Sequence, residues 1–162
     1  MKRPQWTKQL MFSVSWGPGI PKAALDMWEE NLKFLNELLI KNSISLVHVY
    51  LHWHNDPDLI HYCGVTYLDE KRMAFCQGND KETMLHEVAH LMVKFPEHNE
   101  KWADVLLQLH AKYLKGTELR NADAELCKDY TKAVNAYRER YKKEPPKSRK
   151  RRRATEEEPE VL

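Results

Sequence analysis

Hydrophobic and polar residues alternate in two stretches near the start of the chain, as they do in strands with one buried face. From residue 9 to residue 16 every second side chain is apolar, and the run ends at Gly17-Pro18-Gly19. Residues 45–53 alternate in the same way. A period of two indicates a half-buried strand, and glycine together with proline ends it. The sequence therefore predicts strands at 9–16 and 45–53.

Between these strands the apolar positions follow a helical period. They are spaced three and four residues apart, which places them on one face of a helix. They are Leu25, Trp28, Leu32, Leu35 and Leu39. Because proline is favoured in the first turn of a helix, we expect this helix to begin near Pro21 and to end near Lys41.

The middle of the chain predicts a hairpin, and the second half predicts helices. The hairpin strands cover 60–68 and 72–77, and the helices cover about 80–94, 98–115 and 119–142. The two strands of a hairpin are antiparallel. We therefore expect an α+β domain in which a small, mostly antiparallel sheet packs on helices, with long helices at the C-terminal end.

Charge divides the chain into a body and a tail. Of the 162 residues, 26 are Lys or Arg and 24 are Asp or Glu. Residues 142–162 hold 8 of the basic and 5 of the acidic residues, which leaves the body with a net charge close to zero. The tail has no large apolar residue before Val161, so it cannot build a core. We expect one folded domain at 1–141 and a disordered tail, first basic and then acidic, at 142–162.

The basic run within this tail can bind the phosphate backbone of nucleic acid without sequence preference. It consists of Lys147, Arg149, Lys150, Arg151, Arg152 and Arg153. Nucleic acid is therefore a candidate partner of the tail.

Other features of the sequence exclude several classes of protein. No apolar run is long enough to span a membrane, and the first residues lack the apolar segment of a secretory signal. The three cysteines include no C-x-x-C pair, which excludes a disulfide scaffold and a four-cysteine zinc ribbon. We expect an intracellular, cytoplasmic protein, or a nuclear one in a eukaryote, with no membrane partner.

The motif that carries chemistry is H-E-x-x-H at residues 86–90. Histidines four residues apart lie on one face of a helix, so His86 and His90 can bind a single Zn²⁺. Glu87 lies beside them and can take a proton from a zinc-activated water as general base. Asn79 and Glu82 have the spacing of a capping box, which supports a helix here.

A catalytic zinc ion has three protein ligands and an open fourth position. The best candidate for the third ligand is His98, which lies one turn before Trp102 at the start of the next amphipathic helix. Glu118 and Glu125 on a later helix are alternatives, because gluzincin and ImmA-like peptidases use a glutamate from such a helix. The sequence predicts one zinc ion per chain.

The order of these parts resembles the SprT-like, or Spartan-type, zinc metallopeptidases. A strand, H-E-x-x-H, a short connection and H-x-x-x-W at the start of an amphipathic helix match at His86, Glu87, His90, His98 and Trp102. The resemblance covers about residues 70–115. It implies a minimal zincin-like fold in which the three histidines bind zinc and the glutamate is the catalytic base. It also implies an endopeptidase, often one that cleaves proteins associated with DNA.

Two functional hypotheses remain open at this point. The first is a hydrolase that cleaves peptide bonds in a protein or peptide substrate, either a SprT-like enzyme or, as an alternative, a gluzincin or ImmA-like regulatory peptidase. The second is a zinc-stabilised binding or regulatory protein without turnover, docked to nucleic acid or a partner by its basic tail, in which a fourth protein ligand would close the site. A hydrolase also needs a hydrogen-bond donor for the developing oxyanion. The tyrosines that can supply it, none of which the sequence favours, are Tyr113, Tyr130 and Tyr137.

Overall fold

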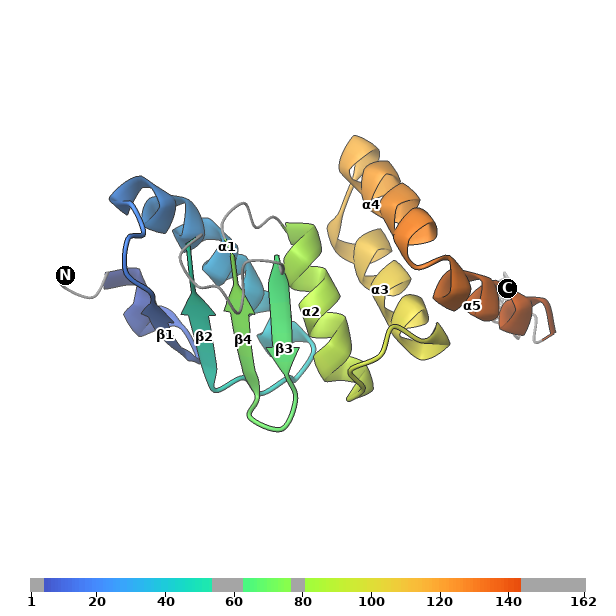
Figure 1. Cartoon of the computed structure of the whole chain (residues 1–162), viewed down its shortest axis with the longest axis horizontal. Coiled ribbons are helices and arrows are strands. Elements are labelled where there is room, and N and C mark those ends of the chain that lie inside the picture. Colours follow the sequence, from blue (N-terminus) through green and yellow to red (C-terminus); the bar gives the residue numbers. More distant parts are fainter. Residues whose placement is uncertain (1–4, 54–62, 77–80, 144–162) are drawn as a thin grey trace, which may run out of the picture.

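The computed structural model describes residues 5–53, 63–76 and 81–143, with side chains as far as residue 140. The described chain consists of helices and a four-stranded sheet, which confirms the α+β class (Figure 1). The elements are a short 3₁₀ helix η1 (Gln5–Gln9), β1 (Ser13–Trp16), α1 (Lys22–Lys41), β2 (His48–Leu51), β3 (Gly64–Tyr67), β4 (Arg72–Phe75), α2 (Lys81–Val93), α3 (Glu100–Tyr113), α4 (Gly116–Asp129) and α5 (Thr131–Lys143).

The sheet is mixed, and the expectation that it is mostly antiparallel was wrong. Its strand order is β1-β2-β4-β3. The β1–β2 and β2–β4 pairs are parallel, and the predicted hairpin β3–β4 is the antiparallel pair. Helix α1 connects β1 to β2, and a helical crossover returns the chain to the same end of the sheet, so these strands are parallel. The hairpin then places β4 beside β2 and leaves β3 at the edge.

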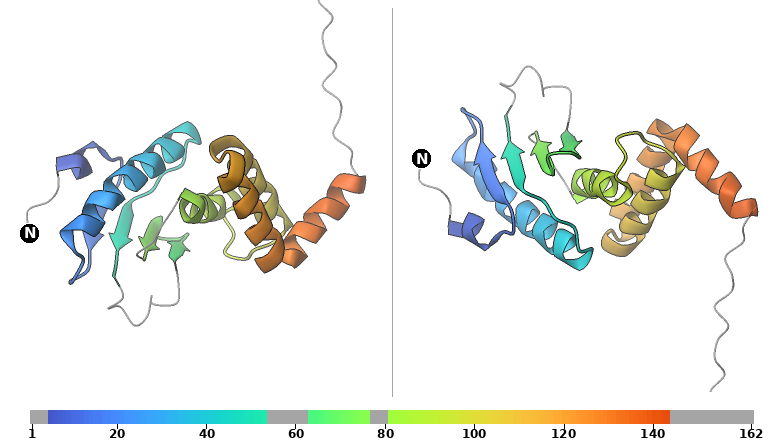
Figure 2. Two further views of the ribbon diagram at one scale, coloured as in Figure 1. Left: turned by 90° about the horizontal axis from the view of Figure 1, so that it is seen from above. Right: turned by 90° about the horizontal axis from the view of Figure 1, so that it is seen from below.

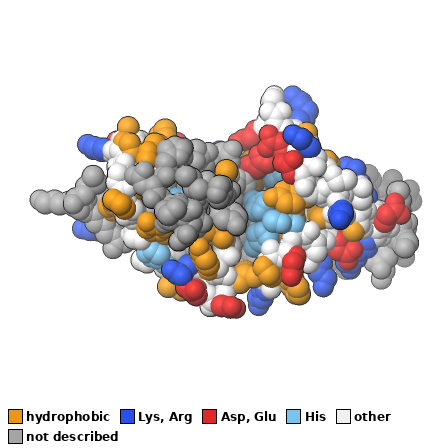
Figure 3. Space-filling model, viewed as in Figure 1, with side chains coloured by type: hydrophobic (Ala, Val, Ile, Leu, Met, Phe, Trp, Pro, Cys, Tyr) orange, Lys and Arg blue, Asp and Glu red, His pale blue; other side chains and the backbone are white. Residues whose placement is uncertain are grey.

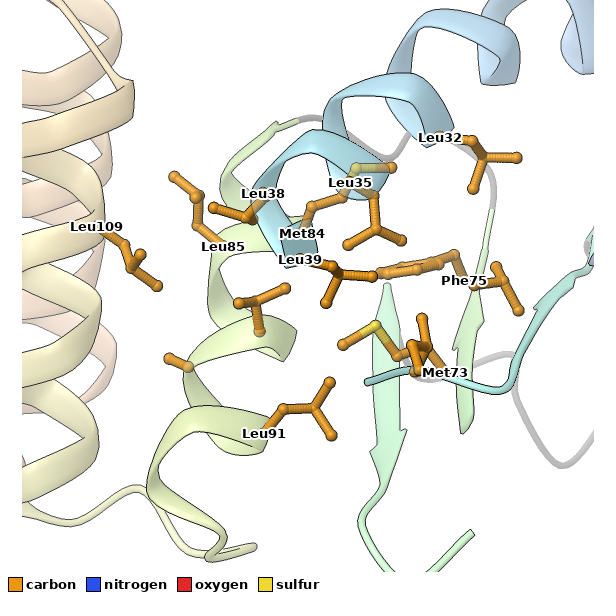
Figure 4. Packing of buried hydrophobic residues seen from close by; sticks show 14 of the residues in the cluster. Leu32, Leu35, Leu38, Leu39, Met73, Phe75, Met84, Leu85, Leu91 and Leu109 are labelled. Atoms are coloured by element: carbon orange, nitrogen blue, oxygen red, sulfur yellow. The ribbon is translucent and has the colours of Figure 1, made fainter. Parts of the chain in front are cut away.

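The main core lies between α1, the sheet and α2. Helix α1 covers one face of the sheet, as the views along the sheet show (Figure 2). Its buried leucines meet Met73 and Phe75 of β4 on one side and Met84 and Leu85 of α2 on the other (Figure 4). Trp28 adds a ring contact with Phe75 at 6.0 Å between centroids. Helix α2 is therefore held by apolar packing along its length.

The predicted single helix at 119–142 is two helices, α4 and α5, which meet at Tyr130. The backbone of Tyr130 leaves the helical conformation, with φ −121° and ψ 38°. The Thr131 hydroxyl donates hydrogen bonds to the carbonyls of Cys127 and Lys128, at 2.9 and 3.0 Å, at the end of α4. Because of this break both helices can turn apolar residues toward α3: Leu126 from α4, and Ala133 and Val134 from α5.

The predicted tail lies almost entirely outside the described residues. Helix α5 ends at Lys143, two residues beyond the predicted end of the folded domain at residue 141. The basic run from Lys147 to Arg153 is not among the described residues, nor is Asn79, the predicted cap of α2. Within the described part of the chain, no helix combines the length and the apolar character that crossing a membrane requires.

Leu35 tests the importance of the core around α1. Its side chain is fully buried, so we expect Leu35→Ala to lower the free energy of unfolding by about 2–5 kcal/mol through lost contacts and a residual cavity. Urea denaturation measures this value. Ile40→Ala on the same helix is the control, because Ile40 is 52% exposed and its loss should change stability by less than about 0.5 kcal/mol. Equal losses in the two variants would contradict the packing described.

Candidate metal centre

Helix α2 positions the first three residues of the candidate site. It packs against the edge strand β3 on one side and against α3 on the other. His86 and His90 lie one turn apart on the face directed at α3, and both rings contact the Trp102 ring of that helix. Glu87, one residue on, points toward β3 and is almost fully buried. Packing on both sides therefore fixes the direction of all three side chains.

A tight connection between α2 and α3 brings His98 to the same place. Helix α2 ends before Lys94, which has a positive φ of 57°. The Lys94 N–H donates a hydrogen bond to the His90 carbonyl at 2.9 Å. Asn99 caps α3 through its side-chain oxygen, which accepts hydrogen bonds from Lys101 N at 3.0 Å and Trp102 N at 3.1 Å. His98 thus precedes the helix cap, whereas the sequence predicted that the helix itself begins there. The connection turns its ring back over α2.

The three histidines present their Nε2 atoms to a common point. His98 Nε2 lies 3.0 Å from His86 Nε2 and 3.2 Å from His90 Nε2. Two nitrogens bound to one tetrahedral zinc ion at ~2.0–2.1 Å lie roughly 3.3–3.4 Å apart, so the observed spacing fits a single ion. This group can hold a metal ion. It is the one group of at least three such ligands that the described residues form.

The surroundings favour the form of histidine that binds metal. His90 Nδ1 donates a hydrogen bond to the Phe95 carbonyl at 3.0 Å, which leaves the Nε2 lone pair for a metal ion. Burial lowers the pKa of His86 to about 3, with smaller contributions from nearby histidines. Burial and the neighbouring His90 lower the pKa of His98 to about 4. At neutral pH the rings are therefore uncharged and can act as ligands.

Glu87 is a buried carboxylate beside the three histidines. The Thr66 hydroxyl donates a hydrogen bond to its Oε2 at 2.6 Å, and its Oε1 lies 4.0 Å from His86 Nε2. Burial raises the pKa of Glu87 to about 7, against the smaller opposing effect of the Thr66 hydrogen bond. Near neutral pH the carboxyl group can therefore both accept and give up a proton.

Gly64 on β3 provides the space that Glu87 occupies. A Cβ atom at this position would lie 2.9 Å from Glu87 Cγ, which is closer than such atoms approach in proteins, and 3.0 Å from Thr83 Cγ2, which is a tight contact. Any larger residue at position 64 would displace the carboxylate. Glycine is therefore required here for close approach of the strand to α2.

The site opens into a cleft of about 690 Å³. Residues of β3 line one side, α2 forms the base, and residues of α3 and α4 line the other side. In the space-filling view the histidines are visible in a hollow near the middle of the molecule, with acidic side chains beside them (Figure 3). A peptide or ligand can therefore reach the three histidines from solvent.

Of the three candidate tyrosines, Tyr130 is the one that lines this cleft. Its ring lies 4.4 Å from that of His98 and 4.9 Å from that of Trp102, measured between centroids. Burial raises the pKa of its hydroxyl, followed in effect by the negative charges of Asp129 and Glu87. The hydroxyl is therefore protonated at neutral pH and can donate a hydrogen bond. Tyr113 and Tyr137 are not among the residues that line the cleft.

The sequence-predicted residues His86, Glu87, His90 and His98 are brought together. The alternative third ligands are not part of this group: Glu125 lies on the wall of the cleft, and Glu118 does not line it. Sequence reasoning missed Gly64 and Thr66, whose role depends on which strand packs against α2. The tail residues Lys147 and Arg149 to Arg153 lie outside the described residues.

Comparisons with protein-family models, with curated proteins and with solved structures found no match to this chain.

Replacing His98 tests the metal centre. We expect the protein to bind one divalent transition-metal ion. His98→Ala should lower the affinity for this ion by more than roughly 10–100-fold, which is the usual cost of losing a residue that only hydrogen-bonds to a ligand. Titration with Co²⁺ or Zn²⁺, followed by elemental analysis, measures both quantities. His48→Ala is the control, because His48 bonds to the Ser13 and Ser15 hydroxyls and is not part of the histidine group that the described residues form. Unchanged affinity in His98→Ala would exclude the three-histidine centre.

Proposed function

We propose that the protein is a zinc-dependent metalloendopeptidase of the SprT-like type. The observation that carries the proposal is the convergence of three uncharged histidine nitrogens beside a buried carboxylate, at the base of an open cleft. Three imidazoles suit zinc and leave a fourth position for water or substrate. A structural zinc site would instead have a fourth protein ligand. No fourth ligand accompanies the three histidines among the described residues.

Bound zinc would supply a Lewis acid for the scissile carbonyl and would lower the pKa of a water at its open position to about 7. His86, His90 and His98 would hold it, with the Phe95 carbonyl orienting the His90 ring. Glu87 would take the proton from the attacking water and later deliver it to the leaving amine. The Thr66 hydroxyl holds one carboxylate oxygen, which leaves Oε1 directed at the histidines.

Strand β3 offers a place for an extended substrate. It is the edge strand of the sheet, and Gly64, Val65 and Thr66 line the cleft. Its outer edge, which pairs with no other strand among the described residues, can form backbone hydrogen bonds with a peptide laid along the cleft. The basic run Lys147–Arg153 could bring such an enzyme to nucleic acid, and this part of the proposal rests on the sequence alone.

Glu87→Gln tests the hydrolytic mechanism. The amide is nearly the same size but cannot accept the proton, so we expect hydrolysis of a denatured protein substrate to fall by about 10²–10⁴-fold. Zinc content should remain that of the unmodified chain, because Glu87 is not a ligand. Elemental analysis and a gel or mass-spectrometric cleavage assay measure the two quantities. Full activity in Glu87→Gln would contradict the mechanism, and zinc bound without any turnover in the unmodified chain would favour a binding protein.

Tyr130→Phe tests the oxyanion donor. If the Tyr130 hydroxyl donates to the developing oxyanion, its loss should lower kcat by about 10²-fold with a small change in KM. Steady-state kinetics on a fluorogenic peptide separate the two constants. Tyr113→Phe serves as the control, because its hydroxyl accepts a hydrogen bond from Asn42 Nδ2 at 3.4 Å, outside the cleft. Equal losses of kcat in the two variants would remove Tyr130 from this role.

A further inference from the structure

Among the described residues, the carboxylates that line the cleft are not balanced by any basic side chain. Three carboxylates line the cleft in addition to Glu87: Glu82 of α2, and Glu125 and Asp129 of α4. We call Glu125 and Asp129 the acidic wall. No Lys or Arg is among the described residues that line the cleft. Figure 3 shows acidic side chains gathered next to the histidines. Any substrate that enters the cleft therefore meets negative charge beside the proposed zinc centre.

Helix α4 holds its two acidic residues in place. Glu125 and Asp129 are one turn apart, so they lie on the same face of the helix. Ala122 and Leu126 are buried beneath them, and Asp123 accepts a hydrogen bond from the buried His110 of α3 at 3.0 Å. Within the described residues neither Glu125 nor Asp129 forms an ion pair. Their charge is thus available to a cation that arrives from solvent.

The acidic wall does not have the form of a second metal site. The described residues contain one group of His, Cys, Asp and Glu side chains close enough to share an ion, and that group is the three histidines. Carboxylates spread along a cleft wall suit a long, flexible cation rather than a compact ion. Lysine and arginine have this shape, with an apolar stem and a charged head. Leu106 and Leu126 line the same cleft and offer an apolar surface to the stem.

We propose that the acidic wall binds a lysine or arginine side chain of the polypeptide substrate next to the scissile bond. This proposal rests on the proposed peptidase function, because it assigns a substrate class to the same cleft. Phosphate groups are repelled by the wall, so the cleft takes basic polypeptide rather than nucleic acid. The charged end of the lysine or arginine side chain lies between Glu125 and Asp129, while the backbone of the substrate follows strand β3.

Binding is measured first, in a form that does not depend on turnover. The zinc-loaded full chain carrying Glu87→Gln is titrated with two fluorescent peptides of equal length, one with Lys and Arg residues and one with Gln at those positions. We expect the basic peptide to bind about 3- to 10-fold more tightly, and Glu125→Gln with Asp129→Asn to remove this preference. Added salt should weaken binding of the basic peptide more than of the neutral one.

Glu118→Gln is the matched control. Glu118 is an exposed acidic residue of α4 that does not line the cleft, so removing its charge should leave the preference in place. Equal binding of the two peptides, or an equal effect of Glu118→Gln and of the double change at Glu125 and Asp129, would overturn the proposal. Thermal melts of each variant confirm that it is folded.

Cleavage then separates this proposal from the proposed function. With the active chain, we expect kcat/KM to be about 3- to 10-fold higher for peptides with Lys or Arg, and this ratio to fall toward one in the double variant. Efficient cleavage with no preference would overturn the acidic-wall proposal and leave the peptidase function standing. Wall-dependent binding with no cleavage by the zinc-loaded chain would overturn the peptidase function and leave the acidic wall as a binding site for basic polypeptide.

Discussion

Helix α2 is packed on both sides, and the geometry of the site follows from this packing. Met84, Leu85, Val88 and Ala89 are fully buried, which holds the helix against the sheet and against α3. A rotation of α2 would expose these side chains to water and would cost the free energy of their burial. The helix therefore presents His86 and His90 to α3 and Glu87 to β3 in one orientation. A site built on such a rigid helix needs little rearrangement when a metal ion binds.

Two short-range features complete the centre around this helix. The left-handed turn at Lys94 and the Asn99 cap reverse the chain within a few residues, so His98 returns to the helix it has just left. Gly64 allows β3 to approach α2 closely enough to bury the Glu87 carboxylate. Burial lowers the pKa of the histidines and raises that of the glutamate. Both changes avoid charge in a region of low dielectric.

The residues around the break between α4 and α5 form part of the cleft lining. The sequence predicted a continuous helix at 119–142, in which Tyr130 would have a helical backbone. In the structure Tyr130 lies instead at the junction of two helices, with its ring 4.4 Å from that of His98. Glu125 and Asp129 near the end of α4 line the cleft, as does Tyr130 at the junction. The two carboxylates and the Tyr130 hydroxyl thus belong to the same cleft as residues of β3, which is an edge strand among the described residues.

Local sequence patterns are enough to predict the α+β class, the hairpin, most helices and the four residues that form the candidate centre. These features depend on local spacing: a period of two or 3.6 residues, and histidines one helical turn apart. The parallel pairing of β1, β2 and β4 could not be predicted in this way, since strand order depends on how a crossover helix packs. The choice of His98 rather than Glu118 or Glu125 as the third member of the group likewise depends on how the chain folds back on α2. The roles of Gly64, Thr66 and Tyr130 have the same origin, because each acts through a residue distant in sequence, and no local pattern encodes such a contact.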